Sequence, residues 1–69
     1  MDKKLLAKGM IKGMEDMGAT FVKSDNFDVY FDVKIGSEID DETKLKRAKE
    51  VFMKSFGLGL KIRRVSANG

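Results

Sequence analysis

Nine residues near the middle of the chain alternate strictly between apolar and polar side chains. The apolar positions are Phe27, Val29, Phe31, Val33 and Ile35, and the polar side chains between them are Asp28, Tyr30, Asp32 and Lys34. Successive side chains of a β-strand point to opposite faces, so the pattern predicts a strand over 27–35 with one buried face. Any fold of this chain must therefore cover one face of a sheet with apolar groups and leave the other in water.

A second strand over 19–24 is expected to pair with this one as a hairpin, with the turn at Ser24-Asp25-Asn26. Two registers are open. A two-residue loop pairs Val22 with Val29 inside and leaves Phe21 beside Tyr30 outside. A three-residue loop puts Phe21 inside against Val29, and we prefer it because it buries more apolar surface.

Residues 2–17 have the periodicity of an amphipathic helix. Its apolar stripe contains Leu6, Ala7, Met10, Ile11, Met14 and Met17. Asp2 can cap the start, and Gly18 stands where a C-terminal glycine is expected. Gly9 and Gly13 each cost about 1 kcal/mol relative to alanine inside a helix. Close approach of this helix to the sheet is the explanation that we favour.

A second helix is predicted to begin in the stretch from Ser37 to Glu42 and to reach Ser55 or Phe56, with Gly57 as its stop. Its apolar face consists of Leu45, Ala48, Val51, Phe52 and Phe56. The alternation that begins at Leu58 predicts a third strand that ends near Val65. Residues 66–69 are expected to form a frayed tail.

These elements predict a single small domain over 1–69, an α+β two-layer sandwich in the order α-β-β-α-β. We expect a three-stranded, mainly antiparallel sheet with both helices on one face, the third strand returning parallel to the second. A chain of 69 residues buries only about 60% of its unfolded surface, so its stability margin is small. Two open sheet edges would favour a further strand or a second subunit.

The composition argues against most catalysis, because the chain contains no histidine and no cysteine. Disulfides, the usual zinc sites and histidine or thiol chemistry are therefore absent. The acidic run Asp40, Asp41 and Glu42 suits a helix start better than a cation site. We predict a protein that is not an enzyme and has no cofactor, metal or small-molecule substrate. No apolar run approaches the length of a membrane span, and a cytoplasmic location is expected.

Charge is distributed unevenly along the chain, whose formal net charge is +3. Residues 21–43 carry a net charge of −5 and residues 44–69 a net charge of +7. Pairs such as Asp40–Lys44, and the series Glu42, Lys46, Glu50 and Lys54, are expected to neutralise part of the second helix. Five basic residues are left without a local partner and are candidates for nucleic-acid binding: Arg47, Lys49, Lys61, Arg63 and Arg64.

Protein binding is the function that we prefer, with a copy of the chain itself as one candidate partner. Tyr30 lies on the polar face of its strand in either register, and Met53 lies among charged residues of the second helix. The predicted protein-binding residues are Tyr30, Asp32, Lys61, Arg63 and Met53. In this hypothesis the contact uses the open sheet face and an edge strand. Tyr30 is the anchor, and Lys61, Arg63 and Asp32 set charge complementarity with the partner.

Overall fold

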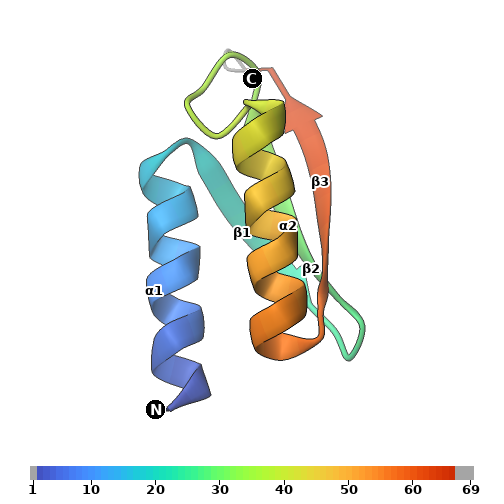
Figure 1. Cartoon of the computed structure of the whole chain (residues 1–69). Helices are drawn as coiled ribbons and strands as arrows, with labels where there is room; N and C mark the ends of the chain where they lie inside the picture. Colours follow the sequence, from blue (N-terminus) through green and yellow to red (C-terminus); the bar gives the residue numbers. More distant parts are fainter. Residues whose placement is uncertain (1, 67–69) are drawn as a thin grey trace.

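A computed structural model of the chain describes residues 2–66, which form two helices and three strands (Figure 1). In chain order these are α1 (Lys3–Asp16), β1 (Ala19–Ser24), β2 (Asp28–Lys34), α2 (Glu42–Phe56) and β3 (Gly59–Val65). Strand β2 is central, antiparallel to β1 and parallel to β3, so the sheet is mixed. The predicted α-β-β-α-β sandwich is confirmed. Of the predicted tail, Ser66 follows β3, and 67–69 lie outside the described residues.

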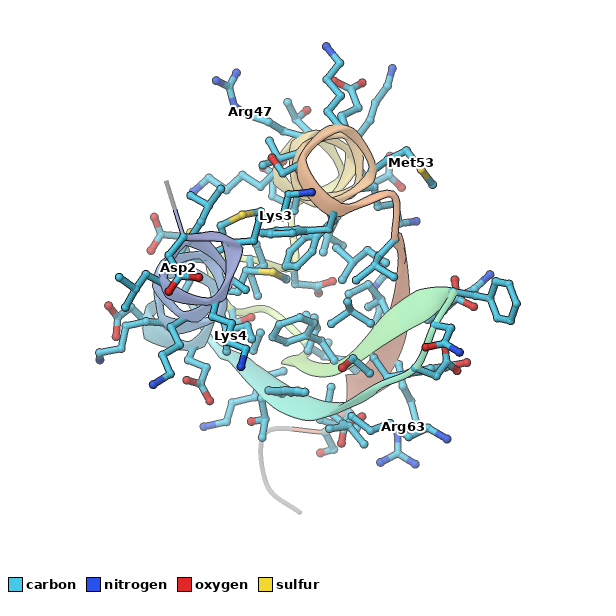
Figure 2. The ribbon with its side chains drawn as sticks, turned by 90° about the horizontal axis from the view of Figure 1, so that it is seen from below. Asp2, Lys3, Lys4, Arg47, Met53 and Arg63 are labelled. Atoms are coloured by element: carbon cyan, nitrogen blue, oxygen red, sulfur yellow. The ribbon has the colours of Figure 1, made fainter. Side chains whose placement is uncertain are left out.

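Both helices cover the same face of the sheet, with α1 beside β1 and α2 beside β3 (Figures 1 and 2). The buried face of β2 consists of Val29, Phe31 and Val33, as the alternation predicts. The Phe31 ring lies 5.8 Å from the ring of Phe21 and 6.2 Å from that of Phe52, measured between centroids. One aromatic cluster thus joins β1, β2 and α2.

The two ends of the predicted strand are wrong, because β2 is shorter than the alternating pattern. Phe27 is 77% exposed and Ile35 is 57% exposed. Phe27 belongs to the hairpin turn, where the Asp25 carboxylate accepts hydrogen bonds from the amides of Phe27 and Asp28 at 2.8 and 2.7 Å. Ile39, from the loop before α2, is only 1% exposed and contributes to the core instead.

The hairpin register differs from both predicted ones, although Phe21 does pack against the core as preferred. Phe21 lies opposite Phe31 rather than Val29, while Lys23 pairs with Tyr30. The register shifts at Val22, which is the extra residue of a β-bulge. Both predictions failed because they assumed a regular ladder and a turn centred too early in the chain.

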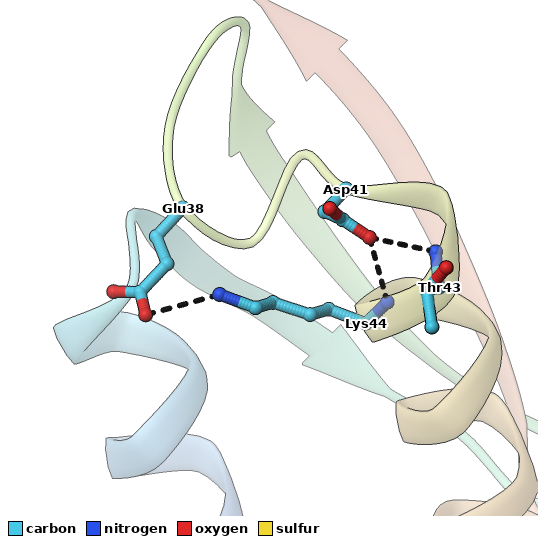
Figure 3. A network of polar contacts seen from close by, with 4 residues as sticks. All are labelled: Glu38, Asp41, Thr43 and Lys44. Carbon is cyan, nitrogen blue, oxygen red and sulfur yellow. Dashed lines mark hydrogen bonds and ion pairs between the residues drawn. The ribbon is translucent and has the colours of Figure 1, made fainter.

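The helix ends agree with the sequence signals. Asp2 caps α1, and Gly18 follows it with a φ of +110°. Asp41 caps α2 through hydrogen bonds from the amides of Thr43 and Lys44 (Figure 3), and Gly57 ends that helix in a left-handed conformation. Of the capping signals between Ser37 and Glu42, Asp41 is therefore the one that caps the helix.

The explanation offered for Gly9 and Gly13 is wrong. A Cβ atom built on either residue would meet nothing within 4 Å, so neither glycine is needed for close approach to the sheet. Both positions of α1 instead border open space.

Candidate protein-binding site

The sheet face opposite the helices brings together four of the five predicted protein-binding residues. In the parallel pairing of β2 and β3, Tyr30 lies beside Lys61 and Asp32 lies beside Arg63. These four side chains line a shallow hollow of about 240 Å³. The alternation of β2 places them there, because the residues between them face the helices.

An ion pair joins the two strands across this face. The Arg63 guanidinium donates two hydrogen bonds to the Asp32 carboxylate, from Nε at 2.9 Å and from Nη2 at 2.8 Å. The contact holds the pKa of Asp32 below its usual value and raises the pKa of Arg63. Arg63 is therefore not an unpaired cation, as the sequence suggested, and its guanidinium is held in a defined position.

Tyr30 is held between two groups of the hairpin. The Lys23 ammonium lies 4.9 Å from the centroid of the Tyr30 ring, within range of a cation–π interaction. The Tyr30 hydroxyl makes a long 3.5 Å hydrogen bond to the Asp25 carboxylate, whose negative charge is the main cause of a raised Tyr30 pKa. Amide donors of Asp28 and Phe27 in turn lower the pKa of Asp25.

Two further residues lie on this face: Val22, which the preferred register already placed outside, and Lys23, which the sequence did not predict there. Val22 is 51% exposed and, with Lys23, lines the same hollow as Tyr30. In a regular strand, Lys23 would share a face with Phe21 and point toward the helices. The extra residue of the bulge, Val22, instead places the Lys23 side chain on the helix-free face beside Tyr30. No local signal in residues 19–24 reveals such a bulge.

Met53 lies elsewhere. It is 53% exposed on the outside of α2, whereas Arg63 projects from the opposite side of the molecule (Figure 2). Met53 therefore does not share a surface with the other four predicted residues.

The five basic residues considered for nucleic-acid binding lie in three places. Lys61 and Arg63 are on the helix-free sheet face. Lys49 and Arg64 line a hollow between α2 and β3, and Arg47 borders the groove between the two helices. Among the described residues, these five side chains thus form no single basic surface.

Asp40 differs from the prediction that paired it with Lys44. Its carboxylate accepts hydrogen bonds from the Gly36 amide at 3.0 Å and from Arg64 Nε at 2.7 Å. These donors, the amide first, lower the Asp40 pKa. Lys44 bonds instead to Glu38 at 3.1 Å (Figure 3). The loop turns Asp40 toward β3 before the helix begins, which is why helical spacing misassigned its partner.

The predicted series of ion pairs along α2 does not form within residues 2–66. The ion pairs found there are Lys12–Asp16, Lys44–Glu38, Arg63–Asp32 and Arg64–Asp40. Within the same range no acidic residues cluster in a way that could hold a metal ion. Neither described helix combines the length and apolar character needed to cross a membrane.

Comparison with known proteins finds no matching family model, no matching curated protein and no matching solved structure.

Proposed function

We propose that this chain is a small, non-catalytic regulatory protein that binds another protein through the helix-free face of its sheet. The observation that carries the proposal is the convergence of Tyr30, Asp32, Lys61 and Arg63 around one hollow. Tyrosine and arginine are enriched at the centres of protein interfaces. The Asp32–Arg63 pair holds the Arg63 guanidinium in place, so less side-chain entropy is lost on binding.

The face of the sheet suits a contact better than its edges do. Strand β1 is interrupted by the bulge at Val22, and the edge strand β3 carries Lys61, Arg63 and Arg64. Bulges and charged side chains are the features by which proteins limit strand addition. A second copy of the chain is the first partner to test, because the face presents acidic and basic groups together. We place this activity in the cytoplasm, because a chain without cysteine suits a reducing compartment.

Site-directed photocrosslinking tests the proposal on the full chain. The photoreactive residue p-benzoylphenylalanine replaces Val22 beside the hollow or, as the matched control, Met53 on α2; both sites are about half exposed. We expect a covalent adduct, a dimer or a complex with a host protein, from position 22 and not from position 53. Adducts from both positions in equal yield, or from neither, would contradict the proposal.

The substitution Tyr30→Ala is the companion test of the anchor. It should reduce the position-22 adduct at least about tenfold, as expected for a central aromatic residue of an interface. Sedimentation over a range of concentrations determines whether the partner is a second copy. Titration of single- and double-stranded oligonucleotides at low salt examines the nucleic-acid alternative, for which the affinity should fall linearly on logarithmic axes as salt rises.

A further inference from the structure

A second surface, separate from the sheet face, lies between the two helices. Helix α1 packs on β1 and α2 packs on β3, and a groove of about 350 Å³ remains between them. Its lining is largely apolar: Met10, Met17, Ala48 and Val51 are partly exposed, over the buried side chains of Met14 and Phe52. Flexible methionines are typical of surfaces that adapt to apolar partners.

Two small residues, Gly13 of α1 and Ala48 of α2, belong to the lining of the groove. Gly13 has no side chain, and a Cβ built there would meet nothing within 4 Å. Ala48 of α2 adds only a single methyl group to the lining, while Val51 remains partly exposed. Open space therefore remains between the two helices beside Gly13.

Three charged residues line the groove: Glu38, Lys44 and Arg47. Glu38, the acidic group of the lining, is engaged by Lys44 at 3.1 Å (Figure 3). Arg47 projects outward from α2, and Lys3 points from the start of α1 toward α2 (Figure 2). Neither Lys3 nor Arg47 belongs to an ion pair formed among residues 2–66. Arg47 belongs to the groove lining, whereas Lys3 lies beyond it, so a partner seated here would gain by placing a carboxylate beside Arg47.

The shape of the groove selects a helix as occupant. Helices α1 and α2 run antiparallel on the sheet (Figure 1), and α1 has 14 residues, a length of about 21 Å. On α1 the lining extends from Met10 to Met17, about two helical turns, so a third helix laid along it could place apolar residues spaced i, i+3, i+4 and i+7 against the groove. We propose that the groove between α1 and α2 binds an acidic amphipathic helix of another protein.

Two synthetic peptides of about 14 residues test this proposal with the full chain. Both carry leucine along one helical face; one has glutamate on the flanks and the other has lysine. Amide spectra of the isotope-labelled protein locate the binding site, and fluorescence anisotropy measures affinity. We expect the glutamate peptide to bind at least ten times more tightly, with spectral changes at Met10, Gly13 and Val51.

Protein variants separate groove binding from folding. Gly13→Leu should weaken binding of the glutamate peptide at least tenfold while the fold is retained, because the added side chain enters open space and leucine favours helix. Arg47→Glu should abolish the preference for the glutamate peptide. Met53→Ala, on the outside of α2, should leave binding unchanged.

Several outcomes would overturn the proposal: equal affinity for the two peptides, spectral changes at the sheet face instead, or unaltered binding by Gly13→Leu. Binding of dodecanoate to the groove without binding of the glutamate peptide would also contradict it, in favour of a lipid ligand. Because Tyr30 lies on the other side of the sheet, Tyr30→Ala should not affect the peptide. The sheet-face and groove proposals therefore succeed or fail separately.

Discussion

Glycine has opposite consequences at two positions of this chain. Gly18 has a φ of +110°, and a Cβ atom there would collide with Ser37, so both backbone and space require glycine. Gly9 lies within α1, and a Cβ there would meet no atom within 4 Å. One position is therefore essential to the link between α1 and β1, while the other only weakens a helix.

Substitution by alanine should separate the two cases. We expect Gly18→Ala to destabilise the fold by about 1–3 kcal/mol, through strain and the contact with Ser37. Gly9→Ala should stabilise it by about 1 kcal/mol, because alanine is the better helix former. Denaturant unfolding followed by circular dichroism measures both changes. A loss of stability in Gly9→Ala would show that a group presses on that site.

At the scale of the element, the start of α2 depends on one carboxylate. Asp41 Oδ1 accepts hydrogen bonds from the amides of Thr43 at 2.8 Å and Lys44 at 3.2 Å (Figure 3). These amides have no partner inside the helix, since they belong to its first turn. The cap therefore determines where the chain leaves the loop and enters the helix that carries Leu45 and Phe52 into the core.

Removing this cap should cost a measurable part of the stability. Asp41→Ala is expected to lower the free energy of unfolding by about 1 kcal/mol. Asp41→Ser should recover most of the loss, because a serine hydroxyl accepts the same hydrogen bonds. Thermal unfolding of the two variants beside the unsubstituted chain provides the comparison. Equal losses in both variants would mean that the carboxylate acts by some route other than capping.

At the scale of the whole molecule, two carboxylates tie β3 to distant parts of the chain. Asp32 joins β2 to Arg63, and Asp40 joins the loop before α2 to Arg64. Their donors lower the pKa of both carboxyl groups in the folded protein. The unfolded chain therefore binds protons more readily, and this stabilisation is present above the usual carboxyl pKa near 4 and lost as the pH falls below it.

The predicted consequence is a loss of stability in acid. The denaturant midpoint should change little between about pH 7 and 5 and fall steeply below about pH 4. Asp40→Asn should make that fall shallower. Arg64→Gln should do so less, because the Gly36 amide, the larger cause of the lowered Asp40 pKa, remains. If Asp40→Asn left the fall of the denaturant midpoint below about pH 4 unchanged, the Asp40 carboxylate would not contribute to the loss of stability in acid.

Sequence alone determined the order of the elements, the buried face of β2, the capping residue Asp2 and the terminal glycines; it placed the start of α2 between Ser37 and Glu42 but did not single out Asp41 as the cap. Each of these follows from periodicity or from contacts within a few residues along the chain. The same alternation indicated that Tyr30, Asp32, Lys61 and Arg63 share a face.

Only the tertiary structure decided the bulge at Val22, the burial of Ile39 and the partners of Arg63 and Arg64. It also decided that the helices leave a groove and that Met53 lies away from the sheet face. These features depend on segments that are far apart in the sequence and come into contact only when the strands pair and the helices pack on the sheet. Asp32 and Arg63, for example, are 31 residues apart along the chain. The spacing of residues within one element contains no information about tertiary contacts. For this reason helical spacing predicted Lys44 rather than Arg64 as the partner of Asp40.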